Sequence, residues 1–459
     1  MYTFSNRLKM FAIITSVIGA LLWGWGFASA PSDVDEVKTM LAEEASHHGG
    51  GHGEDANHGE GGGSYDMTQE HGETAGHGEE AGHGDPDEHA EHVFSQLSNK
   101  PWSALYVAAF FFMMIALGTL AFYAIQRAAQ AGWSPLLFRV MEGITGYLLP
   151  GTLIMLVLLL LSVFHVNGIF HWMHDGLTDP ASDNYDKLIA GKSGFLNSTG
   201  FIIRAVVFIA AWNIFRYFMR KFSLAQDTAE DNRYFKKNFR ISAGFLVVFI
   251  YTESMMSWDW IMSFDPHWFS TLFGWYVFAS MFVSAITVIA LVTIYLKSKG
   301  LLQEVNDSHI HDLAKFMFGI SIFWTYLWFS QFMLIWYSNI PEEVTYFITR
   351  IEDYKLPFFG MLAMNFIFPL LILMNSDYKR MNWFVIMAGV VILAGHYIDI
   401  FNMVMPATVG DRWFIGAAEI GAVLLFLGIF ILVVFSSIAK HPLIAKRNPL
   451  IEESRHFHY

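Results

Sequence analysis

Five ionisable side chains lie within stretches that are otherwise apolar enough to cross a membrane: Arg204, Glu253, His396, Asp399 and Glu419. Placing an ionisable group at mid-bilayer costs roughly 2.5–3.5 kcal/mol, so such groups tend to face a bundle interior and to have a function. Counting about 1.5 Å per residue from each helix end places all five between the membrane centre and its outer surface, on four helices. We therefore expect a single polar cluster in which Arg204 neutralises an acid such as Glu253.

Such a cluster has two interpretations. It is either a proton relay or polar ligand site, or a set of buried ion pairs that fixes helix register. Five groups at similar depth favour the functional interpretation. A route to the inner surface would need further polar groups, and the candidates are Glu142, Tyr147, Ser321, Thr325 and Tyr326. Ser321 and Thr325 share a helix face at i, i+4 spacing.

The elements that position these residues are predicted to be ten transmembrane helices. Hydrophobic residues make up 54% of the 459 and charged residues only 15%, so lipid must cover much of the apolar surface. Runs long enough to span about 30 Å of hydrocarbon fall near residues 8–28, 102–126, 138–165, 194–219, 240–262, 269–297, 312–338, 357–375, 382–405 and 413–438. The sequence thus indicates an all-α integral membrane protein with both termini on one side.

Lysine and arginine set the orientation. With the N-terminus inside, the inner loops and tails hold twenty of these residues and the outer loops seven, so N-in, C-in is predicted. The first segment imitates a signal peptide, with Arg7, Lys9 and an Ala28-Ser29-Ala30 site. Trp23, Trp25 and the length of the apolar run favour a retained anchor helix over residues 1–28.

Residues 29–101 are predicted to be an outer, flexible loop that contains a Gly/His/Glu tract at 46–92. The tract holds nine histidines and is too polar to build a core. A solvated tether is favoured over a specific metal site, although weak binding of zinc, copper or nickel by His47, His48, His52 and His58 is expected. The loop also carries most of the net charge of −13, and no basic stripe indicates nucleic-acid binding.

The chain contains no cysteine, which excludes cysteine-ligated iron–sulfur clusters, c-type haem attachment and disulfides. Bis-histidine haem needs paired histidines at matched depth, whereas His396 is the only central one and His165 lies at a boundary. Aromatic residues between Phe323 and Tyr337 could stack on a quinone but are more typical of packing. We expect this chain to bind no redox cofactor of its own.

Three stretches carry a resemblance to a known family: TESMMSWDWIMSFDPHWFSTLFGWYVFASMF at 252–282, NFIFPLLILMNSDYKR at 365–380 and GHYIDIFNMVMP at 395–406. They closely resemble the NrfD/PsrC-like membrane subunits of bacterial alternative complex III, and most of all the second such subunit. The resemblance covers essentially the whole membrane region, and SWDWIMSFDPHW is its most specific part.

The resemblance implies an inner-membrane protein with two four-helix bundles, at 102–262 and 263–405. The first helix and the last, within 406–459, would be peripheral. It also implies a role in quinol:cytochrome c oxidoreduction, with haem c and iron–sulfur clusters on periplasmic partner subunits, a second NrfD-like membrane subunit and, as a further partner, a terminal oxidase. Quinone or quinol binding is the expectation attached to the family, and the polar pair His396 and Asp399 would either bind the quinol head or pass protons.

Two other functions remain open from the sequence. One is a purely structural scaffold of the same complex. The other is an unrelated secondary transporter, which would be expected to show inverted repeats with helices broken at matching positions. No convincing pair of such breaks is present.

Overall fold

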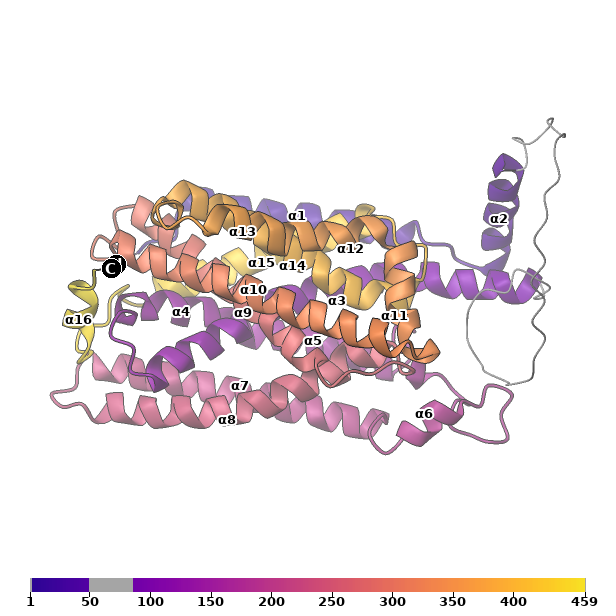
Figure 1. The fold of residues 1–459 in the computed structure, drawn as a ribbon, viewed down its shortest axis with the longest axis horizontal. Helices are drawn as coiled ribbons and strands as arrows, with labels where there is room; N and C mark the ends of the chain where they lie inside the picture. Colours follow the sequence, from indigo (N-terminus) through magenta and orange to yellow (C-terminus); the bar gives the residue numbers. More distant parts are fainter. Residues whose placement is uncertain (1, 49–85, 459) are drawn as a thin grey trace.

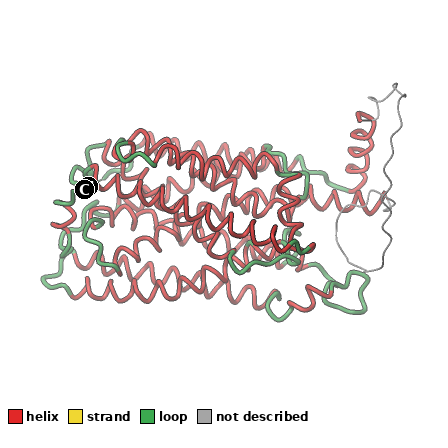
Figure 2. Tube along the Cα trace, in the orientation of Figure 1, coloured by secondary structure: helices red, strands yellow, loops and turns green. Residues whose placement is uncertain are grey.

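The computed structural model describes residues 2–48 and 86–458, and every regular element in these ranges is a helix (Figure 2). Ten of the helices in this part of the chain are long and apolar enough to cross a membrane, as predicted. The ten spans are α1 (Asn6–Ala28), α3 (Pro86–Ala128), α4 with α5 (Phe138–Ile144 and Leu148–Val163), α7 (Ser198–Gln226), α8 (Arg233–Trp260), α9 (Phe273–Ser298), α10 (Asp307–Ser338), α12 with α13 (Lys355–Leu362 and Phe368–Leu373), α14 (Asn382–Val409) and α15 (Ala417–Ala439).

The prediction of a loop over residues 29–101 is wrong at both ends. Residues Val34–His48 form α2, and α3 begins at Pro86, well before the apolar run that marks its membrane part. The sequence did not predict these two helical segments because they are rich in polar residues. A helix that projects beyond a bilayer needs no apolar face. Residues 49–85, which make up most of the Gly/His/Glu tract at 46–92 and include His52 and His58, lie outside the described residues.

Two spans are interrupted. A 3-10 turn at Thr145–Tyr147 separates α4 from α5, and a π-helical segment at Ala363–Ile367 separates α12 from α13. A π segment inserts one extra residue into a turn, and such segments are frequent at functional sites. The second interruption bears directly on the polar site described below.

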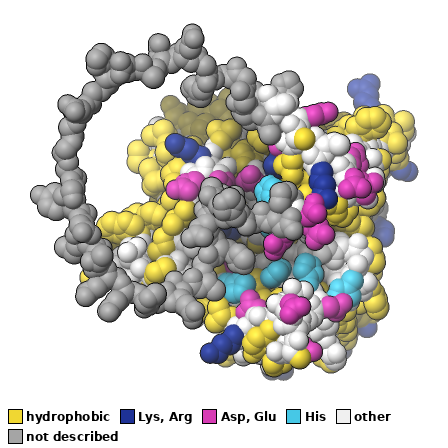
Figure 3. Space-filling model, turned by 90° about the vertical axis from the view of Figure 1, so that its right-hand side faces the viewer, with side chains coloured by type: hydrophobic (Ala, Val, Ile, Leu, Met, Phe, Trp, Pro, Cys, Tyr) yellow, Lys and Arg dark blue, Asp and Glu magenta, His cyan; other side chains and the backbone are white. Residues whose placement is uncertain are grey.

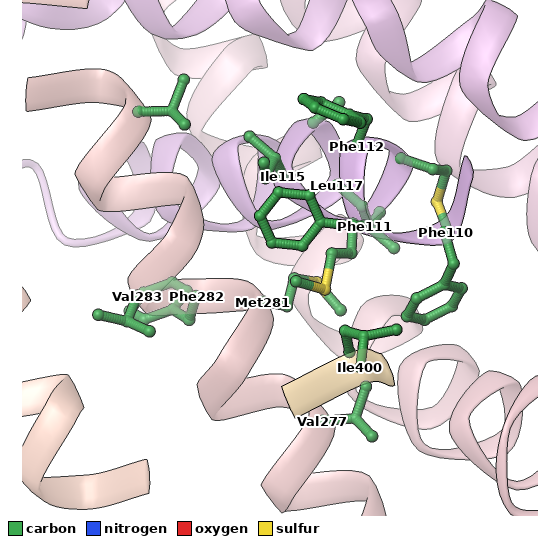
Figure 4. Packing of buried hydrophobic residues seen from close by; sticks show 14 of the residues in the cluster. Phe110, Phe111, Phe112, Ile115, Leu117, Val277, Met281, Phe282, Val283 and Ile400 are labelled. Carbon is green, nitrogen blue, oxygen red and sulfur yellow. The ribbon is translucent and has the colours of Figure 1, made fainter. Parts of the chain in front are cut away.

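The core is built around α3 and α9. In the most apolar 18-residue stretch of each helix, 94% and 89% of the residues are buried, respectively. Side chains of α3 interlock with those of α9, and Ile400 of α14 packs beside them (Figure 4). Phenylalanine, methionine and branched aliphatic side chains fill this contact. Because both helices are surrounded on all sides by protein, the other spans are arranged around them.

The first and last spans pack against each other through small residues. A Cβ atom on Gly19 would lie 2.2 Å from the backbone nitrogen of Leu425, and one on Gly421 would lie 2.3 Å from that of Trp23. Only glycine permits two helix backbones to approach so closely, and such contacts drive helix association in lipid. The first span is peripheral, because only 11% of the residues in its most apolar 18-residue stretch are buried.

The two four-helix bundles remain a prediction: α3 packs against α5 and α8 of the first expected group, and α9 packs against α10 and α14 of the second. However, α3 also packs along α9, α14 and α15, so the groups share one core. The assignment to the NrfD/PsrC-like fold remains a prediction.

Both chain ends lie at one end of the bundle, and α2, α6 (Lys187–Lys192) and α11 (Pro341–Glu352) lie at the other (Figure 1). At this second end, acidic and histidine side chains gather on the visible surface (Figure 3). We refer to the two as the inner and outer ends, following the predicted orientation.

Candidate functional site

The pair His396 and Asp399 lies in a fully buried polar cluster between α9, α10 and α14. Asp399 accepts hydrogen bonds on both oxygens, from the hydroxyl of Tyr276 and from Trp324 Nε1 at 2.9 Å. The Nδ1 atom of His396 lies 3.5 Å from Asp399 Oδ2 and 2.9 Å from Ser280 Oγ. A small movement would bring this imidazole nitrogen and this carboxylate oxygen into hydrogen-bond distance.

Asn365 closes the cluster from the π-helical segment. Its Nδ2 lies 3.5 Å from His396 Nδ1, and its side chain occupies the space that a Cβ at position 395 would need, since that atom would lie 2.1 Å from Asn365 Oδ1. Gly395 therefore allows an amide to approach the histidine. In this cluster, Asn365 Oδ1 and His396 Nε2 are buried without a hydrogen-bond partner among the described residues.

A cavity of about 10 Å³ lies beside Asp399, on its outer side. This volume is at the lower limit for one water molecule. Gln331 Nε2 and Asn402 Oδ1 belong to residues that line it, and both atoms are buried without a protein partner in the described chain. Leaving a buried polar atom without a hydrogen bond costs about 1–3 kcal/mol.

Arg350 lines the same cavity from α11 and is only 4% exposed. Its guanidinium donates to the carbonyls of Asn402 at 3.0 Å and Tyr346 at 2.7 Å and stacks on the Tyr346 ring. Within the described residues no carboxylate lies within 4.0 Å of it. The buried Arg350 and the buried Asp399 thus line the same cavity.

Arg204 does contact a buried acid, as expected, but the predicted partner is wrong. Arg204 donates to Asp259 through Nε at 2.6 Å and Nη2 at 2.8 Å. The sequence could not distinguish Asp259 from Glu253, because both lie on α8 and the rotation of that helix, which tertiary packing sets, decides which acid faces Arg204. With both oxygens of Asp259 engaged, this pair has the geometry of a structural clamp.

Glu253 lies apart from these groups. It is 3% exposed, its Oε1 accepts from Ser257 Oγ at 3.2 Å, and no cation of the described chain lies within ion-pair distance. It borders an apolar cavity of about 240 Å³ that Trp275 and Phe278 also line. The expected single cluster is therefore wrong: depth matches, but the side chains point into different parts of the bundle.

Glu419 and Glu142 have local structural partners. Glu419 Oε2 accepts from the Gly416 amide at 2.7 Å and so caps the start of α15. Glu142 accepts from Arg139 at 2.7 Å and from Tyr123 at 2.8 Å, near the inner end. Both carboxylate oxygens of Glu142 are therefore engaged by fixed donors, which argues against Glu142 as a proton carrier.

The remaining inner candidates do not form a connected path. Tyr147 and Ser321 each bury a hydroxyl without a partner in the described chain, and Thr325 donates to the Ser321 carbonyl within its own helix. Tyr326 is 63% exposed, so its proposed place in an internal path is wrong. Ser321 stays of interest because it lies one turn from Trp324.

The weak metal binding expected of His47, His48, His52 and His58 falls on side chains that the structure does not describe. His47 and His48 end α2 with undescribed side chains, and no group of three or more His, Asp or Glu elsewhere in the described residues is arranged to hold a metal ion.

Six residues of the site were not selected from the sequence as site residues: Tyr276, Ser280, Gln331, Arg350, Asn365 and Asn402. Tyr276, Ser280 and the Arg204 partner Asp259 fall within the stretch at 252–282 that carries the family resemblance, and Arg350 is one of the seven lysine and arginine residues counted in the outer loops. The available signal was i, i+3 and i, i+4 spacing, since Tyr276 and Ser280 share a face, as do Asp399 and Asn402.

Comparison with models of protein families finds no match to this chain. The curated proteins likewise include none that matches it. What is established is the class, an all-α protein with ten candidate membrane spans and a buried His–Asp cluster.

Proposed function

We propose that this chain is a cofactor-free membrane subunit of a quinol-oxidising complex of the alternative complex III type, and that its His396–Asp399 cluster relays protons during quinol oxidation. Its partners would be a second NrfD-like membrane subunit and periplasmic subunits that carry haem c and iron–sulfur clusters, in the inner membrane of a bacterium.

One observation carries the proposal. The three stretches that resemble the family are far apart in sequence, and each contributes to the same cluster. The first supplies Tyr276 and Ser280, the second Asn365, and the third His396 and Asp399. Stretches that served helix packing alone would not need to place polar side chains in one buried site.

The chemistry suits proton transfer. Quinol oxidation releases protons, and a relay needs groups that exchange protons and a chain of hydrogen bonds to the surface. His396 and Asp399 provide the first. The small cavity bordered by Gln331, Asn402 and Arg350 provides the next step toward the outer end.

The test uses the whole complex, reconstituted in vesicles, with electron transfer and proton release recorded together. Asp399→Asn preserves shape but cannot carry a proton, so we expect normal assembly and haem content with proton-coupled turnover slowed by about 100-fold, the low end of what a positioned acid or base contributes. Glu253→Gln, at an isolated carboxyl, should leave both signals unchanged.

Three results would contradict the relay. If Asp399→Asn matches wild type in both signals, the cluster is structural and the subunit is a scaffold. If Glu253→Gln is impaired instead, the proton carrier lies on α8. Failure of this chain to copurify with haem c and iron–sulfur subunits would remove the complex itself from the proposal.

A further inference from the structure

A second concentration of charge lies at the inner end of the bundle, remote from the His–Asp cluster. Four arginines of α3, α4 and α7 extend into a seam beside the end of α15: Arg127, Arg139, Arg216 and Arg220. Two carboxylates, Glu142 and Asp227, are within ion-pair distance of members of this group. The set therefore carries an excess of two positive charges.

The excess belongs to Arg216 and Arg220. Arg139 takes both carboxylates, at 2.7 Å from Glu142 and 2.5 Å from Asp227, and Arg127 lies 3.9 Å from Glu142. In the described structure, neither Arg216 nor Arg220 has an acid within 4.0 Å. Unpaired guanidinium groups in a membrane-embedded seam are costly unless an anion compensates them.

Their present contacts are weak or neutral. Arg220 donates to the carbonyls of Glu142 at 2.6 Å and Ser437 at 3.3 Å. Among the described residues, Arg216 makes one hydrogen bond, from Nε to Thr145 Oγ1, and it is long at 3.4 Å. Most of its planar fork of donors, which suits a phosphate group, is therefore free for a ligand.

The positive field extends to the loop that follows α15. Burial, followed by the positive charges of Arg220 and Arg139, lowers the pKa of His441. Lys440 beside it is exposed. Groups from three different segments thus surround the seam with positive potential.

The seam also opens onto an apolar surface that lipid chains would cover. Leu149, Leu153 and Val157 follow Thr145 at four-residue spacing along α5, and each is about half exposed. On α7, Ile214 and Tyr217 flank Arg216 and are more than half exposed. A ligand here meets cations at the membrane boundary and hydrocarbon toward the membrane centre.

We propose that Arg216 and Arg220 bind the phosphate headgroup of an anionic phospholipid, whose acyl chains lie along the exposed face of α5. A phospholipid satisfies both features, because basic pockets between transmembrane helices on the cytoplasmic side bind anionic headgroups. This site is independent of the proposed proton relay.

The experiment measures lipid binding to the purified full chain, by native mass spectrometry and by the thermal unfolding midpoint. Phosphatidylglycerol is compared with phosphatidylcholine, and inorganic phosphate is added separately. Wild type should prefer phosphatidylglycerol. In Arg216→Gln/Arg220→Gln, the affinity for phosphatidylglycerol should fall by about 30-fold, since each basic residue near an anionic membrane contributes roughly a fivefold factor.

Two variants control for charge and for folding. Lys236→Gln/Lys299→Gln removes two exposed cations elsewhere at the inner end and should change the affinity by less than about twofold. Arg216→Lys/Arg220→Lys keeps both charges and should stay within about threefold of wild type. If the double glutamine variant does not fold, Arg216→Gln alone should weaken binding by about fivefold.

The proposal is overturned if wild type does not distinguish the two lipids, or if the glutamine and control variants lose affinity equally. It is also overturned if inorganic phosphate reproduces the full stabilisation, since the ligand would then be a free anion. A loss in the lysine variant equal to that in the glutamine variant would show that the positive charge is not what binds.

Discussion

At the scale of single residues, the functional site depends on one glycine. Gly395 leaves the space that Asn365 needs to reach His396, and the π-helical segment presents Asn365 at that point. An asparagine at this distance orients the imidazole, and the imidazole in turn lies beside Asp399. Residue 395 therefore controls the geometry of the cluster, although it has no group that could carry a proton.

We expect Gly395→Ala to destabilise the protein by about 1–3 kcal/mol, the usual cost of overpacking a buried site. Its new methyl group would lie 2.1 Å from Asn365 Oδ1. Gly319→Ala is the matched control, because nothing lies within 4 Å of a Cβ there and alanine favours a helix. The free energy of unfolding in mild detergent checks both. If the stability of Gly395→Ala is unaltered, the Asn365 side chain can adopt another conformation at no cost.

At the scale of elements, the short helix α6 on the outer surface is held by its N-cap. Asp186 accepts from the amides of Leu188 at 2.8 Å and Ile189 at 3.0 Å, and it lies 2.5 Å from His267 Nε2. These contacts connect α6 to the loop between α8 and α9. Although burial opposes it, the Ile189 amide and His267 lower the pKa of Asp186.

Asp186→Ala should destabilise α6 by about 1 kcal/mol, a typical value for a lost N-cap. Hydrogen exchange at the Leu188 and Ile189 amides is the measurement. Because the folded-state pKa of Asp186 lies below the unfolded value of about 3.9, its contribution is present above that pH. It is lost as the pH falls through the folded pKa. Exchange at these amides that is the same in Asp186→Ala and wild type would show that the cap is unimportant.

At the scale of the whole molecule, the absence of cysteine makes the orientation directly testable. Asp183→Cys places a thiol in an exposed loop at the outer end, and Lys299→Cys places one in an exposed turn at the inner end. A membrane-impermeant maleimide should label position 183 in spheroplasts, whose inner membrane is intact. It should label position 299 only after permeabilisation. The opposite pattern would reverse the orientation and make the outward proton route an inward one.

The sequence predicts the helices of this protein better than it predicts which helix faces contact one another. All ten spans are visible because hydrocarbon thickness imposes a minimum apolar length. Depth is also readable, since rise per residue is constant. Which faces meet is not readable: Arg204 pairs with Asp259 instead of Glu253, and Arg350 turns inward from a segment resembling a surface loop. These choices depend on helix rotation, which many side chains determine together.

The glycine contacts between α1 and α15 have a consequence for how the protein is made. The first span leaves the ribosome with Gly19 and Gly26 exposed to lipid, and the surfaces that match them, around Gly421 and Ala418, are synthesised only after eight further spans. Membrane helices insert first and associate afterwards. The first helix therefore cannot dock on α15 until eight intervening spans have been inserted. A chain truncated before residue 417 would leave the glycine face of α1 without the helix that covers it.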